Sequence, residues 1–355
     1  MMTMQKRSTR THVKAAVLFE LAKPVQIISL SLPPLKKGQV RVSLSYSGIC
    51  HTQLLEVQGL RGADRFLPHT LGHEGAGVVE EVGPAVEKVK AGDRVVLSWI
   101  KGLGQEVPRI QYESSNGLIN SGALSTFMRE TITCENRLTP IPNEMPLREA
   151  ALLGCAFLTG SGIIRNTAKV PPRSTLAVFG TGGIGLSVIL AAALTKPTLL
   201  IAIDVLPQKL DLASKLGATL LINPKESDPL SAIMDATGGQ GVDFAIEAAG
   251  RRETMEQAFR SVRAQGGLCV LAGNLPHGQM ISIDPFDLIK GKRIVGTWGG
   301  ETLPDRDIPK YVAEFLEGKI NLTALIGQEY SLHEINQAFE DLEQGKITRG
   351  LIKFK

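Results

Sequence analysis

Ser174-Thr175-Leu176-Ala177-Val178-Phe179 runs directly into Gly180-Thr181-Gly182-Gly183-Ile184-Gly185, and this stretch decides the fold. Its first half has the apolar character of a buried strand, and its glycines mark a tight turn before an apolar helix that continues to about Leu194. A second strand over residues 199–204 ends at Asp204, about 20 residues after the last glycine of the turn. This order predicts a dinucleotide-binding unit: a strand leads through a glycine turn into a helix, and an acidic residue ends the next strand.

The residues of this turn also predict how a dinucleotide is held. Gly180, Gly182, Gly183 and Gly185 allow the backbone to turn sharply and to approach a pyrophosphate, whose charge meets the helix N-terminus. Asp204 is expected to accept hydrogen bonds from the adenosine ribose hydroxyls and to repel a 2′-phosphate, which favours NAD over NADP. The alternative is a glycine turn of some other α/β protein, with Asp204 an ordinary loop acid.

Downstream of the turn, short apolar runs alternate with helical patterns. A helix over residues 208–216 is predicted to end at Gly217. Further strands are predicted over residues 220–222, 242–246, 267–271 and 293–296. This alternation predicts a parallel, doubly wound sheet. Two amphipathic helices and a closing strand complete the chain, at residues 309–316, 333–344 and 350–354.

The first part of the chain has a different character. Residues 13–97 consist of short strand-like runs separated by Gly and Pro, which predicts a barrel-like β region with little helix. Residues 101–122 are polar and irregular, and they predict a long surface loop. Residues 147–168 have a helical pattern that Pro171-Pro172 closes.

The β-rich region carries a Cys-His pair at Cys50-His51 and a His-Glu pair at His73-Glu74. A thiolate, an imidazole and one more soft ligand bind zinc and leave a fourth position open for substrate. Cys155 is the predicted third ligand, because a metal there lies between the two domains, beside the cofactor. Taken alone, Cys155 would be an ordinary buried cysteine. Its occurrence together with Cys50, His73 and a nucleotide turn favours the metal.

Length, charge and cysteine content narrow the class of protein. With 355 residues two domains are expected, and 39 Lys+Arg against 35 Asp+Glu include no basic block of the kind that binds nucleic acid. The four cysteines lack Cys-x-x-Cys spacing, which argues against a disulfide framework and favours a reducing compartment, with the cytoplasm as the default. Cys134 and Cys269 are expected to be core residues.

Neither a secretory signal nor a membrane span is expected. The basic stretch Met1 to His12 lacks the apolar region of a secretory signal, although a short organellar presequence stays an alternative. The most apolar stretch, residues 184–205, is interrupted by Lys196-Pro197.

Seven short motifs point to one family. They are Gly48-Ile49-Cys50-His51-Thr52, Gly72-His73-Glu74-Gly75-Ala76-Gly77, Gly92-Asp93-Arg94-Val95, Gly154-Cys155 with Thr159-Gly160, Gly180 to Gly185, Asp204 with Lys209, and Gly345-Lys346-Ile347-Thr348-Arg349. On these motifs the chain resembles, over almost its whole length, the zinc-dependent alcohol dehydrogenases of the medium-chain dehydrogenase/reductase family. The resemblance implies an α/β protein with a GroES-like β-barrel catalytic domain, residues 1–156 and 299–355, and a Rossmann NAD-binding domain, residues 157–298.

The resemblance also implies roles for single residues. Cys50, His73 and Cys155 would bind the catalytic zinc, with Glu74 beside them or as an alternate ligand. Thr52 would hydrogen-bond the alcohol oxygen and begin the proton relay.

Cofactor contacts follow in the same way. His51 and Arg349 would touch the pyrophosphate, and Lys209 would reach the adenosine ribose. Thr159 and Ile184 would press the nicotinamide toward the substrate.

Three departures from the family pattern stand out. Residues 101–122 occupy the place of a lobe that binds a second, structural zinc in many relatives, yet they contain no cysteine, so one zinc per subunit is expected. Gln53 stands where relatives have an Asp that supports the zinc-bound His; its amide can accept the imidazole N–H but raises ligand basicity less. Leu55 replaces a His that ends the relay in some relatives, so the proton must leave by another route.

The expected activity is NAD-dependent oxidation of a primary or secondary alcohol to an aldehyde or ketone, with zinc as Lewis acid and hydride transfer to the nicotinamide. Trp99 is expected to line the substrate pocket or, alternatively, to be a core tryptophan. Polyol or sugar dehydrogenation, zinc-free reduction of activated double bonds, and inactive dinucleotide binding are the alternatives. The partners expected are a small-molecule alcohol or aldehyde and a second copy, as a homodimer or homotetramer with the strand at 293–296 at its interface.

Overall fold

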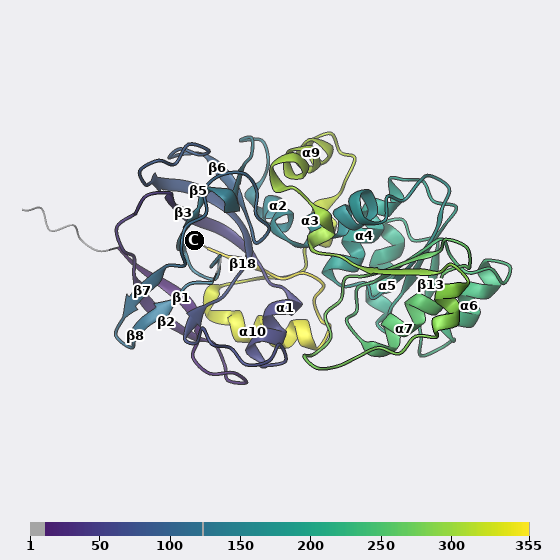
Figure 1. Ribbon diagram of the computed structural model, residues 1–355. Helices are drawn as coiled ribbons and strands as arrows, with labels where there is room; N and C mark the ends of the chain where they lie inside the picture. Colours follow the sequence, from purple (N-terminus) through teal and green to yellow (C-terminus); the bar gives the residue numbers. More distant parts are fainter. Residues whose placement is uncertain (1–10, 123, 355) are drawn as a thin grey trace, which may run out of the picture.

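The structure is a computed structural model that describes residues 11–122 and 124–354 (Figure 1). Most of Met1 to His12 lies outside the described residues, so the interpretation of that stretch stays a prediction. In Figure 1 a β-rich lobe lies on the left and a sheet flanked by helices lies on the right.

The β-rich lobe contains a closed barrel of short strands. Their order around the barrel is β1 (His12–Leu18), β2 (Gln26–Ser31), β7 (Gln111–Ser114), β8 (Gly117–Asn120) and β4 (His69–Thr70). Buried apolar side chains such as Leu30, Tyr112 and Ile119 fill its interior. The predicted barrel-like region is therefore confirmed.

A seven-stranded sheet leads from the barrel to the middle of the molecule. Its order is β10 (Leu138–Pro140), β6 (Arg94–Ser98), β5 (Glu74–Val82), β3 (Gln39–Gly48), β18 (Leu351–Lys353) and β17 (Glu329–Tyr330), with β9 (Glu130–Cys134) also paired to β3. The last strand of the chain thus lies beside β3, where Leu351 is the register partner of Gly48. Below this sheet in Figure 1, α1 (His51–Val57) lies next to α10 (Ile335–Glu343).

The six-stranded sheet on the right is parallel throughout, as predicted. Its order is β13 (Leu220–Ile222), β12 (Leu199–Ile203), β11 (Thr175–Phe179), β14 (Phe244–Glu247), β15 (Leu268–Leu271) and β16 (Arg293–Gly296). The accompanying helices are α4 (Gly183–Ala193), α5 (Pro207–Lys215), α6 (Pro229–Ala236), α7 (Arg252–Ser261) and α8 (Pro285–Ile289). The strand order reverses at β11, and ligands of such sheets bind at the carboxyl ends of the strands at this reversal.

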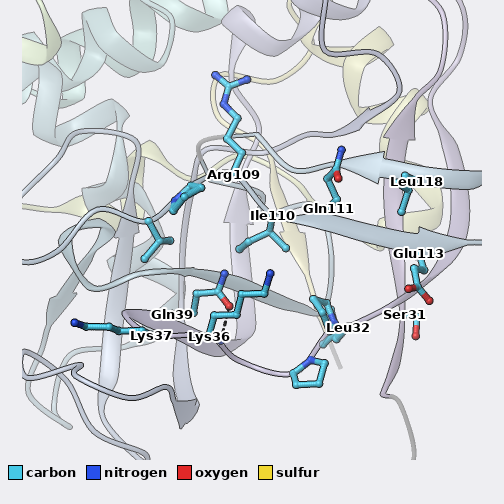
Figure 2. A pocket seen from close by; sticks show the side chains of 14 residues that line it. Ser31, Leu32, Lys36, Lys37, Gln39, Arg109, Ile110, Gln111, Glu113 and Leu118 are labelled. Carbon is cyan, nitrogen blue, oxygen red and sulfur yellow. Dashed lines mark hydrogen bonds between the residues drawn. The ribbon is translucent and has the colours of Figure 1, made fainter.

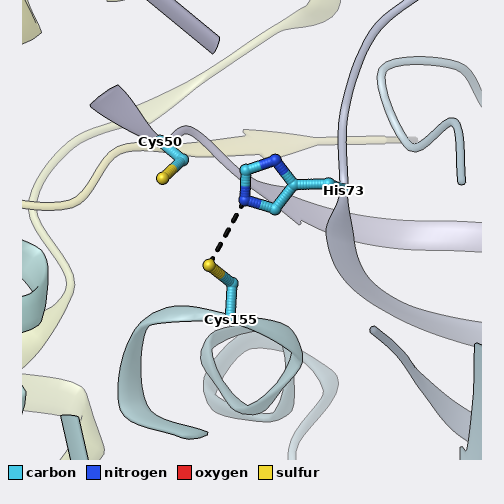
Figure 3. Close-up of side chains that lie close together, drawn as sticks. All are labelled: Cys50, His73 and Cys155. Carbon is cyan, nitrogen blue, oxygen red and sulfur yellow. Dashed lines mark hydrogen bonds between the residues drawn. The ribbon is translucent and has the colours of Figure 1, made fainter. Parts of the chain in front are cut away.

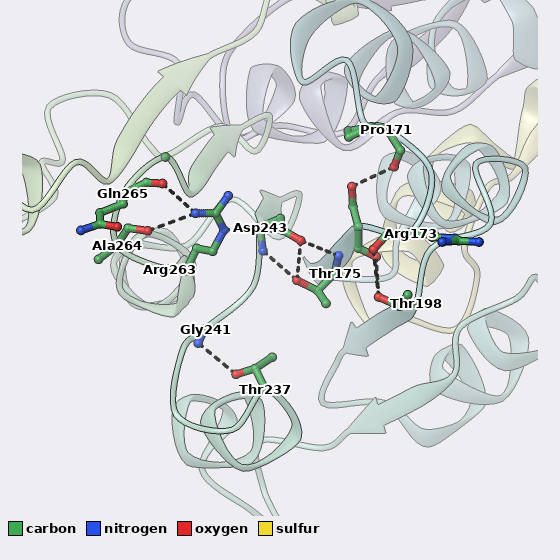
Figure 4. A network of polar contacts seen from close by, with 12 residues as sticks. Pro171, Arg173, Thr175, Thr198, Thr237, Gly241, Asp243, Arg263, Ala264 and Gln265 are labelled. Carbon is green, nitrogen blue, oxygen red and sulfur yellow. Dashed lines mark hydrogen bonds and ion pairs between the residues drawn. The ribbon is translucent and has the colours of Figure 1, made fainter.

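The opposite end of this sheet is held by polar contacts (Figure 4). The Asp243 carboxylate accepts hydrogen bonds from the backbone N–H and the hydroxyl of Thr175 and, at 2.6 Å, from Nε of Arg263. Burial alone would raise the pKa of Asp243, but these bonds outweigh burial and lower it. The network therefore fixes the starts of β11 and β14, far from the glycine turn.

The helical segment predicted over residues 147–168 is interrupted at Cys155. It consists of α2 (Leu147–Ala150), a 3-10 turn (Ala151–Gly154), α3 (Ala156–Gly162) and a π-helical turn (Ile163–Thr167). Cys155 leaves the helical region, with φ −149° and ψ −70°. Among the described residues no single helix is long and apolar enough to cross a membrane; these pieces, Leu147–Gly154 and Ala156–Thr167, meet the criteria only as a pair bent by 56°.

The prediction of one long loop over residues 101–122 is wrong in its second half. Residues 111–120 form the hairpin of β7 and β8, because the side chains of Tyr112 and Ile119 point into the barrel and are fully buried. The stretch is polar in sequence because both short strands lie at the surface of the barrel, with only alternate residues inside. A cavity of about 430 Å³ lies beside this hairpin, lined by residues that include Lys36, Arg109 and Leu118 (Figure 2).

The chain returns from the six-stranded sheet through a short turn, Gly299–Glu301, and α9 (Pro304–Leu316). The helix is longer than the predicted 309–316, since Pro304 stands in its first turn, where a proline is tolerated. Two further 3-10 turns, Leu322–Leu325 and Leu332–Glu334, lead to α10 and β18.

Candidate metal and cofactor site

Three side chains from distant parts of the chain converge between the two halves of the molecule (Figure 3). Sγ of Cys50, a ring nitrogen of His73 and Sγ of Cys155 all lie within 4.8 Å of one another. Nε2 of His73 is 3.3 Å from Sγ of Cys155. Both cysteines are buried and His73 is half-buried, so the cluster lies below the surface with its imidazole partly open. Two thiolates and an imidazole form a donor set that fits zinc.

The backbone around Cys50 is fixed by strand pairing. Cys50 stands between the end of β3 and the start of α1, and the N–H of Ile49 donates to the carbonyl of Gly350. Gly48 is required here, because a Cβ at this position would lie 1.8 Å from Oε1 of Glu74. The end of β3 is thus packed directly against Glu74.

Strand β6 ties the other two ligands together. Ser98, the last residue of β6, is the register partner of Glu74, the neighbour of His73. The Ser98 hydroxyl donates to the carbonyl of Gly154, the neighbour of Cys155, at 2.8 Å. One serine therefore holds both ligand-bearing segments in position.

The carboxylate of Glu74 is turned toward Arg349. Arg349 donates to Oε1 of Glu74, and the N–H of Ala156 donates to Oε2 at 3.3 Å. Glu74 does not belong to the group of ligand atoms that lie within 4.8 Å of one another. The structure thus places Glu74 beside the cluster, and its role as an alternate ligand stays a prediction.

The charges around the cluster shift several pKa values. A hydrogen bond from Cys155 lowers the pKa of Cys50 well below its ordinary value despite burial, with Arg349 and His73 adding to the effect. The same bond and burial raise the pKa of Cys155. Burial raises the pKa of Glu74, against the opposing charge of Arg349. Cys50 is therefore the more readily ionised of the two thiols.

Gln53 makes a different contact from the one expected. Its Oε1 accepts the backbone N–H of Cys50 at 3.2 Å, so this oxygen is engaged with the ligand's backbone. Its Nε2 is buried and makes no hydrogen bond within the described residues. Leu55 is buried, which leaves no polar side chain at that position of α1.

The glycine turn has the geometry of a pyrophosphate cradle. Gly180 has φ +87°, and a Cβ at Gly185 would lie 1.8 Å from the carbonyl oxygen of Gly180. A Cβ at Gly182 would meet nothing within 4 Å, so the turn is open on that side. A Cβ at Gly183 would lie 3.3 Å from Cδ of Arg349, which places this arginine beside the turn as well as beside Glu74.

Asp204 stands at the end of β12, at the edge of the turn. Its Oδ2 accepts the backbone N–H and the hydroxyl of Thr181 at 2.8 and 2.9 Å, and its Oδ1 accepts the N–H of Leu206. The prediction missed Thr181, which occupies a variable position of the glycine motif and is fully buried. These bonds orient Asp204 and leave it half-buried, with part of its acceptor capacity unused.

His51 and Lys209 come together from opposite halves. Desolvation lowers the pKa of His51, and the charge of Lys209 lowers it further while Cys50 opposes. A Cβ at Gly345 would lie 3.7 Å from Nζ of Lys209, so the C-terminal motif lies there too. The structure thus brings His51, Lys209 and the C-terminal motif near one another.

The remaining predicted site residues, Thr52, Thr159, Ile184 and Trp99, lie on or beside elements that adjoin the ligand segments or the glycine turn. Thr52 follows His51 in α1 and is half-buried, and the N–H of Thr159 donates to the carbonyl of Cys155. Ile184 lies in the first turn of α4, and Trp99 follows β6. The Thr159 hydroxyl is buried and unpaired within the described residues, as expected of a group that faces a ligand site.

Two family models match this chain. One, described as a zinc-binding dehydrogenase, matches residues 183–317, and the other, described as an alcohol dehydrogenase GroES-like domain, matches residues 36–143. Curated relatives include the S-(hydroxymethyl)glutathione dehydrogenases of Synechocystis sp., 34% identical, and of Escherichia coli O157:H7, 35% identical; each match covers 96% of this chain and 99% of the relative.

Solved structures of alcohol dehydrogenase proteins superpose on almost the whole chain. An alcohol dehydrogenase zinc-binding domain protein from Burkholderia ambifaria superposes with a TM-score of 0.90 at 31% identity, over 97% of this chain and 99% of the other. The benzyl alcohol dehydrogenase of Acinetobacter calcoaceticus superposes with a TM-score of 0.89 at 30% identity, over 97% and 100%.

Proposed function

Because the chain belongs to the zinc-dependent alcohol dehydrogenases of the medium-chain dehydrogenase/reductase family, we propose that it oxidises its alcohol in the cleft at Cys50, His73 and Cys155. It is an oxidoreductase that acts on CH–OH groups, and its family works with zinc and NAD(H). The observation that supports this site is that the possible ligand atoms of Cys50, His73 and Cys155 lie within 4.8 Å of one another.

Cys50, His73 and Cys155 are the proposed zinc ligands. Bound there, zinc supplies the Lewis acidity that lowers the pKa of an alcohol, and NAD supplies the hydride acceptor. The segment that carries Cys155 is held by the Ser98 hydroxyl at the carbonyl of Gly154, and both cysteines are buried. Glu74 and Arg349 balance the charge behind the ligands.

Thr52 is the proposed first acceptor of the alcohol proton, at its Oγ1. It lies two residues after Cys50, where its hydroxyl can meet the substrate oxygen. Leu55 stands where some relatives end the relay with a His, so we propose that the proton leaves through His51, the exposed neighbour of Thr52, to water.

NAD is the proposed dinucleotide. The open turn at Gly182 admits the pyrophosphate, with Arg349 as its cationic partner and His51 as a hydrogen-bonding partner. Asp204, oriented by Thr181, is the proposed partner of the ribose hydroxyls, and its charge disfavours the 2′-phosphate of NADP.

One zinc per chain is the proposed stoichiometry. The lobe at 101–122 is tied to its surroundings by Glu135, which accepts the backbone N–H of Gln105 in the lobe and those of Glu87 and Lys88 outside it, at 2.8–3.0 Å. These contacts support a lobe that keeps its shape without a metal.

Domain division, assembly and location complete the proposal. The catalytic domain is residues 1–156 and 299–355, and the NAD-binding domain is residues 157–298, in line with the separate sheets of the two halves.

A homodimer, or a tetramer built from it, would form through β16, the outermost strand of the six-stranded sheet, next to the exposed side chains of Val295 and Ile289. All four cysteines are free thiols, which supports a reducing compartment such as the cytoplasm.

A panel of primary, secondary, aromatic and polyol alcohols, assayed with NAD and NADP on metal-quantified protein, tests the proposal. We expect one zinc per chain, turnover with NAD and little with NADP. Turnover that survives removal of zinc would identify the zinc-free reductase instead, and NADH binding without any turnover would identify an inactive dinucleotide-binding protein. Light scattering gives the subunit number.

A further inference from the structure

Glu247 is a fully buried carboxyl at the carboxyl end of β14, and the proposed mechanism does not use it. Its register partners are Phe179, the last residue of β11, and Leu271, the last residue of β15. Doubly wound sheets bind their ligands at this end of the strands. We propose that Glu247 is a positioning residue for the nicotinamide half of the dinucleotide, which holds the loops after β14 and β15 in shape without touching the cofactor. The inference rests on the proposed binding of NAD at the glycine turn.

The side chain of Glu247 shapes the loop that follows β14. Its Oε1 accepts the backbone N–H groups of Ala249 and Gly250 at 2.9 and 2.8 Å, and the hydroxyl of Thr254 at 2.8 Å. Gly250 has φ +72°, so the loop turns tightly around this oxygen. A Cβ at Gly180 would lie 2.7 Å from Cβ of Ala249. The loop that Glu247 holds is therefore packed directly against the proposed pyrophosphate cradle.

The loop after β15 contacts the same residue. The backbone carbonyl of Glu247 accepts the N–H groups of Ala272 and Gly273 at 2.8 and 3.1 Å. A Cβ at Gly273 would lie 2.5 Å from Oε2 of Glu247 and 2.3 Å from the backbone N of Gly250. The two loops thus lie against each other, and the Glu247 carboxyl lies beside both.

The second oxygen of this carboxyl indicates which form it takes. Oε2 of Glu247 is buried and makes no hydrogen bond within the described part of the chain. Burial raises the pKa of Glu247, against the opposing hydrogen bonds from Thr254, Gly250 and Ala249. An ionised carboxylate with an unpaired buried oxygen is costly, whereas the neutral acid costs far less and still accepts hydrogen bonds at Oε1. Glutamine is therefore a close replacement for Glu247.

The place of β14 in the sheet decides which half of the cofactor depends on Glu247. A doubly wound dinucleotide fold has two mononucleotide-binding halves, here β11 to β13 and β14 to β16. Asp204, the proposed partner of the adenosine ribose, follows β12 in the first half. Glu247 and both loops that it holds belong to the second half, which faces the nicotinamide end.

The first test compares NADH with AMP, which carries only the adenosine half. The Kd of each is measured by calorimetry on the full chain, without alcohol. Glu247→Ala should raise the Kd for NADH about tenfold and that for AMP less than about twofold, because the lost hydrogen bonds lie in the second half of the sheet. Glu247→Gln should keep both Kd values within about twofold, because its amide oxygen accepts the same bonds. An unchanged Kd for NADH in Glu247→Ala, an equal loss for AMP, or a Glu247→Gln variant as weak as Glu247→Ala overturns the proposal.

Asp243→Asn is the control for a purely structural loss. Asp243 lies directly before the same strand, at its opposite end, where it accepts hydrogen bonds from Thr175 and Arg263. This variant should lower the melting temperature and keep the Kd for NADH within about twofold. If Glu247→Ala does not fold, Thr254→Val removes one of the three bonds at Oε1 and should raise the Kd for NADH about threefold. An unchanged Kd in Thr254→Val then overturns the proposal.

Turnover separates this inference from the proposed function. In the zinc-loaded enzyme, Glu247→Ala should raise the KM for NAD about tenfold and change the KM for the alcohol less than about twofold. A rise in the KM for the alcohol alone would contradict a role at the cofactor. If wild type binds NADH but oxidises no alcohol, the proposed activity falls, and the Kd values still decide the role of Glu247. If wild type binds NADPH in place of NADH, the proposed cofactor falls, and the same comparison with NADPH decides it.

Discussion

The guanidinium of Arg349 donates a hydrogen bond to the carboxylate of Glu74, and the two side chains are 4% and 0% exposed. Burial alone would lower the pKa of Arg349, but the negative charges of Glu74, Cys50 and Cys155 outweigh it and raise the pKa. This is an ion pair enclosed between the C-terminal segment and the start of β5. The charge of each side chain offsets the cost of burying the charge of the other.

Breaking this pair should be costly. Glu74→Gln and Arg349→Met should each lower the free energy of unfolding by about 3–5 kcal/mol, because each removes the hydrogen-bonded partner of a buried charge. The double variant should lose less than the sum of the two, as measured by urea unfolding. Glu81→Gln, which breaks the exposed pair with Arg41, should cost less than about 1 kcal/mol. Strict additivity of Glu74→Gln and Arg349→Met would contradict the coupling.

Removing a proposed zinc ligand should separate catalysis from cofactor binding. Cys50→Ser and Cys155→Ser should lose zinc and turnover, because a serine hydroxyl is a poor zinc ligand at neutral pH. NADH binding, followed by NADH fluorescence, should stay nearly intact, since the glycine turn is untouched.

Cys134→Ser is the matched control for these two variants. Cys134 is buried like them, but its thiol donates to Asn136 and lies outside the ligand cluster. This variant should keep its zinc and its turnover. Loss of zinc from Cys134→Ser, or full turnover in metal-free Cys50→Ser, is the result that would refute the assignment.

Thr181 should control the affinity for NAD through Asp204. Thr181→Val keeps the shape of the side chain but removes the hydroxyl that donates to Oδ2 of Asp204. One hydrogen bond is worth about 1 kcal/mol, so KM for NAD should rise about fivefold with little change in kcat. Thr198→Val, at the opposite end of the same sheet, should leave KM unchanged. Equal KM values for both variants would show that Thr181 does not orient Asp204.

Glu135 should make the lobe at 101–122 sensitive to acid. Burial alone would raise its pKa, but three backbone N–H donors and Lys88 outweigh burial and lower the pKa below its ordinary value of about 4.5. A lowered pKa in the folded state stabilises the fold above the unfolded-state pKa, and this contribution is lost as pH falls through the folded-state pKa.

The measurement is the melting temperature at pH 7 and at pH 3. Glu135→Gln should lower the melting temperature at pH 7, because its amide N–H₂ meets backbone donors. It should also reduce the fall in melting temperature between pH 7 and pH 3. The control is Glu80→Gln, on an exposed position of β5. An unchanged pH dependence in Glu135→Gln would exclude this carboxylate as a source of acid sensitivity.

Local signals made most of the fold predictable. The strand and turn from Thr175 to Gly185 combine an apolar run, special backbone conformations at glycine and a helix start, and all three depend on residues close in sequence. The three proposed ligands could be singled out in the sequence because each stands in a short motif. Their meeting within 4.8 Å is a tertiary fact that only the strand registers explain.

The missed features depend on distant residues. The break at Cys155 follows from packing, since a Cβ at Gly154 would lie 2.2 Å from the carbonyl oxygen of Leu97. Likewise the hairpin at 111–120 forms because Tyr112 and Ile119 fill a barrel whose other strands lie far away in sequence. The turn of Gln53 toward the Cys50 backbone depends on side-chain geometry that a residue type does not encode.

The separation of the ligands along the chain has a consequence for folding. A metal held by Cys50 and Cys155 closes a loop of about a hundred residues, and closing such a loop removes far more freedom from the unfolded chain than from the folded one. An ion bound there would therefore also be a cross-link within residues 50–155, and part of its binding energy would count as folding energy. Without it, the segments that carry Cys50, His73 and Cys155 would be held together only by their own packing.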